Sequence, residues 1–320
     1  MGRPSTFLSA RVCRCSGILA SMVGQITNQQ SRPVTMPKIK TSDGVNLYYE
    51  EAGTGTPIVF VHEFAGDYRT WEPQMRRFSR DYRCVTYSQR GYPPSDIPDD
   101  AARYGQDFAR SDVIALMDAL KIDKAHVVGH SMGAYTALHV GIKHPRRCIS
   151  VTAAGCGWGS LPDPAARAAM RAQAAENSKM FMENDMATAA AIYTDTPIRH
   201  TQKYKDPRGY AEFAGMLTEH SAKGHALTMA MLQAKRPTLW DMEADLKKFS
   251  VPLLIIVGDE DETCLDGSLF LKRTAPTAGL LVIPRSGHTI TSEEPDAVNA
   301  ALAELFAASE NDRWLAHKPS

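Results

Sequence analysis

The sequence predicts an α/β fold built on a mostly parallel sheet, and three observations carry that prediction. Short apolar runs alternate with helical stretches between residues 57 and 154, which is typical of repeated strand–helix–strand units. The alternation resumes at Val251 after a long interval without a convincing strand. One apolar strand leads through a tight turn, residues 129–133, directly into a helix. We therefore expect one domain with an inserted helical segment, not two independent domains.

Hydrophobic periodicity and turn residues place the individual elements of this domain. The predicted strands are residues 45–51, 57–62, 83–87, 125–128, 148–154, 251–257 and 279–283. The predicted helices between them are residues 71–79, 104–120, 134–143, 265–273 and 295–308. Within 104–120, the residues Val113, Leu116, Met117 and Leu120 form one apolar face, as an amphipathic helix requires.

Residues 158–246 are rich in Ala, Met, Gln and Lys, and they predict a helical cap. Its expected helices are residues 163–183, 187–193, 210–220 and 226–234. The many methionines either pack a core within the cap or line a pliable apolar pocket. The predicted core domain then consists of residues 36–157 and 247–310, with a tail at 311–320.

Residues 1–35 differ in composition from the rest of the chain. They contain several Arg, Ser and Thr, and no acidic residue precedes Asp43. This composition resembles a mitochondrial-type presequence, and an extension upstream of a true start at Met36 is the other interpretation. In both cases we expect a disordered extension. The expected location is cytoplasmic, or mitochondrial if the presequence is genuine.

The amino-acid composition argues against several classes of partner and site. The 36 Lys and Arg balance the 36 Asp and Glu, so charge gives no case for a nucleic-acid partner. No apolar run is long enough to span a bilayer. None of the six cysteines forms a C-x-x-C pair, so we expect reduced thiols and no metal site. The cysteines are Cys13, Cys15, Cys84, Cys148, Cys156 and Cys264.

The turn Gly129-His130-Ser131-Met132-Gly133 is a G-x-S-x-G pattern between a β-branched strand and a helix. Such a turn raises the serine hydroxyl above the carboxyl end of a parallel sheet. The flanking glycines allow backbone segments to approach closely, and the helix N-terminus favours negative charge. The pattern alone is weak, because it arises by chance in a long chain. Its position between a strand and a helix makes Ser131 a candidate nucleophile.

A serine hydroxyl needs a base, and the base needs an orienting acid. Both must come from loops at the carboxyl ends of the strands, where ligands bind. His288 follows the strand at 279–283, and Asp261 follows the strand at 251–257. The order Ser131, Asp261, His288 is the order that G-x-S-x-G hydrolases use. The weaker alternatives are His62, His126 and His130 for the base, and Asp259 and Glu260 for the acid.

A tetrahedral oxyanion requires two preorganised N–H donors. The residue after the nucleophile, Met132, supplies one backbone N–H. The loop after the strand at 57–62 supplies the other, and Phe64 is the expected residue. Both assignments concern the backbone and do not depend on the side chains.

Together these pieces resemble the α/β-hydrolase family from about Lys38 to Ala308. The matching motifs are His62-Glu63-Phe64, Arg90-Gly91 with Ser95, Gly129–Gly133, Gly258-Asp259-Glu260-Asp261 and Gly287-His288. The resemblance implies an eight-stranded sheet, a helical cap inserted after the sixth strand and a serine triad. Small capped carboxylesterases, lactonases and carbon–carbon bond hydrolases are the most similar members.

Two departures from the family pattern affect the expected substrate. Glu63 stands where the family usually has Gly after the histidine, so it either crowds the loop or places a carboxylate near the pocket. Tyr92-Pro93-Pro94 replaces the second glycine of the Arg90 loop and stiffens it. Ser131 argues against epoxide hydrolases and haloalkane dehalogenases, which use Asp at that position.

The resulting expectation is a serine hydrolase that cleaves a small, largely apolar ester or lactone through an acyl-enzyme. His62, Glu63 and Trp158 are the expected substrate-binding residues, and no metal or organic cofactor is needed. One alternative is a carbon–carbon bond hydrolase of a diketone-type acid. The other is a ligand-binding receptor on a hydrolase fold.

Overall fold

The computed structural model describes residues 1–2 and 36–317, and one compact unit begins at Pro37. The predicted N-terminal extension therefore lies almost entirely outside the described residues. Beyond the last helix, the segment 311–317 is held against the sheet edge. Trp314 Nε1 donates to the carbonyl of Thr277 at 2.7 Å, so this part of the tail packs on the domain.

Eight strands form one sheet in the order β1-β2-β4-β3-β5-β6-β7-β8. The pairs β1–β2 and β2–β4 are antiparallel, and all other pairs are parallel. The strands are β1 (Lys38–Lys40), β2 (Asn46–Ala52), β3 (Pro57–Val61), β4 (Arg83–Tyr87), β5 (Ala125–His130), β6 (Cys148–Ala154), β7 (Leu253–Gly258) and β8 (Ala278–Ile283). The expected mostly parallel, eight-stranded sheet is confirmed.

Alternate residues of the central strands build two separate cores, because successive side chains point to opposite faces of a sheet. Val59 and Val61 of β3 pack with residues of α3, α4 and α11. Ile58 and Phe60 of the same strand pack with residues of α2 and α13 on the other face. The covering helices are α2 (Glu72–Phe78), α3 (Gln106–Ala119), α4 (Met132–Lys143), α11 (Glu262–Thr274), α12 (Ile290–Glu293) and α13 (Pro295–Glu310).

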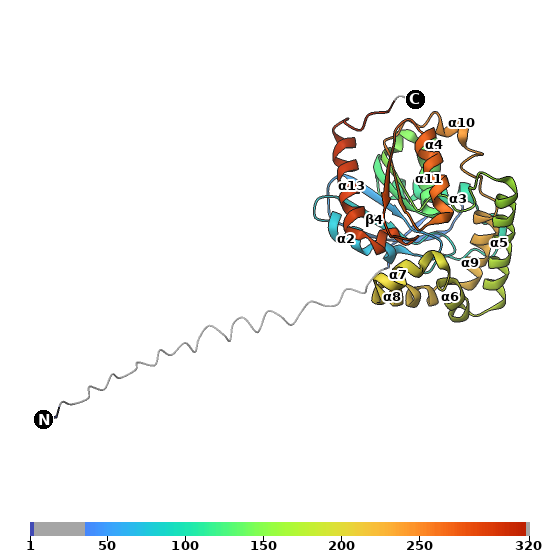
Figure 1. Cartoon of the computed structure of the whole chain (residues 1–320), viewed down its shortest axis with the longest axis horizontal. Helices are drawn as coiled ribbons and strands as arrows, with labels where there is room; N and C mark the ends of the chain where they lie inside the picture. The colour runs from blue at the N-terminus through green and yellow to red at the C-terminus, as the bar shows by residue number, and fades with distance from the viewer. Residues whose placement is uncertain (3–35, 318–320) are drawn as a thin grey trace. The chain divides into compact units, whose positions relative to one another are not determined.

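The chain between β6 and β7 is helical, as expected, and most of it gathers at one end of the molecule, whereas its last helix lies near α4 and α11 (Figure 1). Its helices are α5 (Pro164–Glu183), α6 (Met186–Thr194), η5 (Pro197–Arg199), α7 (His200–Lys205), α8 (Pro207–Thr218), α9 (Ala222–Thr228), a π-helix (Met229–Gln233) and α10 (Glu243–Leu246). We call residues 158–246 the cap. Its insertion after the sixth strand agrees with the family resemblance.

The structure adds elements that periodicity does not predict. β1 is a three-residue edge strand, and η5 and α7 are too short to give a clear helical period. The strand β5 and the helix α4 also extend farther toward Ser131 than expected, to His130 and from Met132. Only Ser131 therefore separates the strand from the helix.

Candidate active site

Ser131 occupies the sharp turn between β5 and α4. It is the residue before the first turn of α4 and has φ 52° and ψ −111°, a backbone conformation that a residue with a side chain rarely adopts. A Cβ on Gly129 would lie 2.1 Å from the carbonyl oxygen of Gly133. A Cβ on Gly133 would lie 2.0 Å from that of Val61. Only glycine fits at either position, which explains the pattern around the serine.

The structure brings Ser131, His288 and Asp261 together from three different loops. Nε2 of His288 lies 2.8 Å from Ser131 Oγ, and Nδ1 lies 2.7 Å from Asp261 Oδ2. The other carboxylate oxygen of Asp261 accepts a hydrogen bond from Thr263 Oγ1 at 3.0 Å. This arrangement can hold one imidazole tautomer with an unprotonated Nε2 facing the serine.

We call the hydrogen-bonded set of Ser131, His288 and Asp261 the relay. The charges of His288 and Asp261 within it stabilise one another. Burial by itself lowers the pKa of His288, but the Asp261 carboxylate outweighs it, so the pKa is raised above the ordinary 6.5. Burial likewise raises the pKa of Asp261, and the neighbouring imidazole reverses this to a net lowering. Asp261 is fully buried. The relay therefore consists of an ionised acid and a histidine that is more basic than usual.

The alternative residues lie elsewhere. His126 contacts Ser150 and Glu310 at the opposite end of β5. His130 is buried, and its Nε2 forms a hydrogen bond of 2.7 Å with the backbone carbonyl of His288. Asp259 and Glu260 are exposed, and neither contacts the imidazole of His288. The geometry favours the assignments made from chain order.

The backbone N–H groups of Phe64 and Met132 remain available. Both residues are buried, and Met132 opens α4. Within the described part of the chain, neither N–H donates a hydrogen bond to another protein group. An unpaired buried N–H is costly unless a ligand uses it. The two groups can therefore receive a developing oxyanion, and this role stays a prediction.

A cavity of about 330 Å³ opens onto Ser131 and His288. The cap and the core both line it. The further lining residues are Phe64, Trp158, Gln173, Asn177, Tyr193, Thr196, Ile198, Met229 and Gln233. The walls combine aromatic and aliphatic surface with neutral amide groups, and among the described residues no Lys or Arg lines this cavity.

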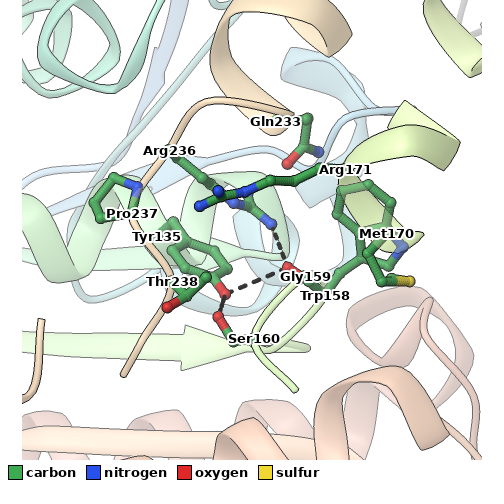
Figure 2. A pocket seen from close by; sticks show the side chains of 10 residues that line it. All are labelled: Tyr135, Trp158, Gly159, Ser160, Met170, Arg171, Gln233, Arg236, Pro237 and Thr238. Carbon is green, nitrogen blue, oxygen red and sulfur yellow. Dashed lines mark hydrogen bonds between the residues drawn. The ribbon is translucent and has the colours of Figure 1, made fainter. Parts of the chain in front are cut away.

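Trp158 lies where the chain enters the cap, and it lines this cavity as expected for a substrate contact. Figure 2 shows how its backbone is held: Arg236, which follows the π-helix of the cap, donates to the Trp158 carbonyl at 2.9 Å. The Arg236 guanidinium stacks on the ring of Tyr135, 3.6 Å from its centroid. Ser160 Oγ accepts from the N–H of Leu239 and contacts the Tyr135 hydroxyl. The first residues of the cap are thus tied to the segment that follows its π-helix and to Tyr135 of α4.

The structure places His62 and Glu63 away from the cavity that contains Ser131. His62 is buried, with Nδ1 near the Glu63 carbonyl and Nε2 accepting from the N–H of Gln89. Burial lowers its pKa to about 4, so it is neutral at physiological pH. Glu63 turns toward Arg199 of the cap. Both side chains therefore shape the loop, and we do not carry them forward as substrate contacts.

Arg199 is the residue that sequence reasoning missed. It belongs to a three-residue helix in the cap and is 1 % exposed, facing a carboxylate 136 positions earlier. A signal was present, because a glutamate in place of glycine inside a buried loop requires a cation. The sequence offered many arginines and no means of choosing among them.

Among the described residues, Asp261, Cys264 and His288 offer potential metal-ligand atoms within 4.8 Å of one another. Two of these groups are already joined in the hydrogen bond of the relay. The Cys264 thiol is buried, and burial raises its pKa well above the usual value. The chemistry of this donor set therefore fits a serine relay better than a metal site.

No helix in the described ranges has the length and apolarity needed to cross a membrane.

Known proteins similar to this chain match it over most of the described domain. The model of the alpha/beta hydrolase family matches residues 58–301. A putative carbamate hydrolase RutD from a Caulobacter species is 28% identical over 83% of this chain and 97% of its own. The 3-oxoadipate enol-lactonase 1 of Acinetobacter baylyi is 31% identical over 75% of this chain and 84% of its own.

A solved structure of Est816, described as an N-acyl homoserine lactone degrading enzyme, is similar with a TM-score of 0.68 and 28% identity. The match covers 84% of this chain and 99% of that one. The family match spans most of the sequence and agrees with the sheet order, the cap and the serine turn described above. The chain is therefore a hydrolase that belongs to the alpha/beta hydrolase family.

Proposed function

We propose that this protein is a serine hydrolase that cleaves a small, largely apolar carboxylic ester or lactone through an acyl-enzyme. The observation that carries the proposal is the continuous relay from Ser131 through His288 to Asp261 at the wall of a cavity. The distances of 2.8 and 2.7 Å are those of a nucleophile within reach of its base, and of a base held by its acid.

In the proposed reaction, Ser131 Oγ attacks the substrate carbonyl while Nε2 of His288 accepts its proton. Asp261 holds the imidazole and stabilises its charged form. The N–H groups of Phe64 and Met132 receive the oxyanion, and His288 then protonates the leaving alkoxide. Water deprotonated by the same imidazole attacks the acyl-enzyme, and Ser131 is regenerated. Every step uses groups of this chain.

The cavity supports an uncharged substrate. Its size suits a small ligand, and its aromatic and aliphatic walls favour apolar surface. The relatives named as an enol-lactonase and as a lactone-degrading enzyme agree with cleavage of an ester bond. A diketone-type acid would bring a carboxylate to walls that offer it no Lys or Arg among the described residues. We therefore place ester or lactone hydrolysis above carbon–carbon cleavage and above a receptor role, and we retain a cytoplasmic location as a prediction.

The test is hydrolysis of short- and medium-chain p-nitrophenyl esters and of lactones by the full chain and by Ser131→Ala. Loss of the nucleophile should lower kcat by at least about 1,000-fold, because triad members act as a unit. Ser309→Ala, on α13 and outside the set of residues that line the cavity, is the matched control and should retain full activity.

Equal rates for the full chain and Ser131→Ala would exclude Ser131 as the nucleophile. Hydrolysis of a diketone acid by the full chain, without any ester or lactone turnover, would replace the proposal by carbon–carbon cleavage.

A further inference from the structure

We propose that Arg199 positions the loop at residues 62–66, so that the active site is complete only when the cap is docked on the core. This inference rests on the proposed serine hydrolase and adds a positioning residue to it. We call residues 62–66 the oxyanion loop, because this loop contains the N–H of Phe64 that we expect to receive the oxyanion.

The contact between Arg199 and Glu63 is a two-point ion pair. One guanidinium nitrogen lies 2.6 Å from Glu63 Oε2, and the other lies 3.3 Å from Oε1. Both side chains are about 1% exposed. A bidentate ion pair of this kind fixes the relative orientation of the two side chains as well as the distance between them. The aromatic ring of Phe213, whose centroid lies 4.6 Å from the guanidinium carbon, also packs against the arginine.

The same short helix also holds the base. The carbonyl of Ile198 accepts a hydrogen bond from the backbone N–H of His288 at 3.0 Å. Ile198 lines the catalytic cavity, whereas Arg199 and Glu63 do not. Neighbouring residues of η5 therefore contact the loop of the base and the oxyanion loop at once.

His130 links the loop of the base to Glu63. Its Nε2 bonds the carbonyl of His288 at 2.7 Å, and its Nδ1 lies 4.0 Å from Glu63 Oε1. Burial lowers the pKa of His130 to about 4, so this ring is neutral at physiological pH and the Glu63 charge is left to Arg199. The nucleophile's neighbour, the base loop and the oxyanion loop thus all meet at the Glu63–Arg199 pair.

Removing the arginine leaves a carboxylate buried beside the expected oxyanion donor. A buried charge without its partner is strongly unfavourable, so the loop will shift to reach water or Glu63 will take up a proton. A shift of Glu63 displaces the next residue, Phe64. An oxyanion donor acts mainly in the transition state, so the loss should fall on kcat and not on KM.

The experiment compares Arg199→Met, Arg199→Lys, Glu63→Gln and the double variant Arg199→Met/Glu63→Gln in the full chain. Lys223→Met is the matched control, because Lys223 is an exposed cap residue whose ion pair with Asp99 of the core involves neither Glu63 nor Arg199. For each protein, kcat and KM are measured with a p-nitrophenyl ester, together with inhibition by a trifluoromethyl ketone whose adduct places an oxyanion on the enzyme.

We expect Arg199→Met to lower kcat at least tenfold, with KM within about threefold of the wild type, and to weaken trifluoromethyl ketone binding by a similar factor. Arg199→Lys should recover part of this loss. The double variant should lie above Arg199→Met, since no charge is left unpaired, but at least threefold below the wild type, since the tie is lost. Lys223→Met should match the wild type.

A folded Arg199→Met with wild-type kcat, or a loss confined to KM, would overturn the inference. Wild-type kcat in the double variant would also overturn it, and this comparison remains decisive if Arg199→Met fails to fold. An equal loss in Lys223→Met would assign the effect to cap docking in general and not to Arg199.

Failure of the proposed function is recognised separately. If the wild type hydrolyses no ester, the rate at which a fluorophosphonate labels Ser131 replaces turnover in every variant. Slower labelling in Arg199→Met than in the wild type then supports the positioning role, and equal labelling contradicts it. A wild type that is not labelled at all overturns both proposals.

Discussion

At the scale of single residues, the protonation of His288 should control activity. Attack by Ser131 requires a neutral imidazole, and Asp261 raises the pKa of His288 above 6.5 despite burial. The value of kcat/KM should therefore fall as the pH drops through a midpoint above 6.5. The sign follows from the charge, because protonated His288 cannot accept the serine proton.

Asp261→Asn tests this relation. The substitution removes the negative charge that raises the pKa, so burial should dominate and the acidic limb should move to lower pH. The plateau should fall by about 10,000-fold, the scale of loss when an orienting acid is removed from a serine triad. The measurement is kcat/KM for a p-nitrophenyl ester from pH 5 to 9.

Asp259→Asn is the control, since Asp259 is an exposed neighbour that does not contact His288. It should keep both the wild-type plateau and the wild-type midpoint. An unchanged acidic limb in Asp261→Asn would contradict the assigned pairing.

At the scale of elements, the junction of β5 and α4 depends on backbone contacts that leave no room for a side chain. Gly133→Ala would place a Cβ 2.0 Å from the carbonyl oxygen of Val61 in β3. Because the Cβ is fixed to the backbone of α4 and the oxygen belongs to the backbone of β3, neither atom can move without disturbing the sheet. We expect a loss of about 3 kcal/mol in the free energy of unfolding, measured with urea, together with loss of hydrolysis.

Gly215→Ala is the matched control for this prediction. Gly215 is an exposed residue inside α8, and an added Cβ meets no atom within 4 Å. Alanine should stabilise the protein there by about 0.5–1 kcal/mol, because it restricts the unfolded chain. Similar destabilisation by both substitutions would refute the argument from close backbone approach.

At the scale of the whole molecule, the contact between cap and core should make stability sensitive to acid. Burial by itself raises the pKa of Glu63, but the Arg199 cation lowers it from 4.5 to about 2. A lowered carboxyl pKa contributes stability above the unfolded value, and that contribution is lost as the pH falls toward the folded value. We expect the free energy of unfolding to decline from about pH 4.5 downward.

Urea unfolding between pH 6 and 3 measures this decline, and Arg199→Met/Glu63→Gln isolates the part due to the pair. The double variant should show a shallower slope because it lacks the titrating carboxylate. Asp67, whose pKa is also held low by His220 and Arg69 against the effect of burial, remains in both proteins. Identical slopes would show that Glu63 does not couple the cap to the core.

Local sequence patterns were enough to predict most of the strands, the turn at Ser131 and the residues of the relay. Short apolar runs identified seven of the strands. The signal is continuous in central strands such as β5 and β7, because both faces of these strands are buried. The glycines around Ser131 identified the turn, since only glycine fits there. Chain order and strand ends then selected His288 and Asp261, because carboxyl ends of parallel strands meet at one edge of the sheet.

Tertiary structure alone decided how the cap contacts the core. Nothing local in Glu63 specifies Arg199, which is 136 residues away in a helix too short to leave a periodic signal. The placement of His62 behind its loop, and of Trp158 in the cavity wall, likewise follows from packing. Sequence patterns report how one segment meets water or the core, whereas partner choice between distant segments depends on geometry that appears only after folding.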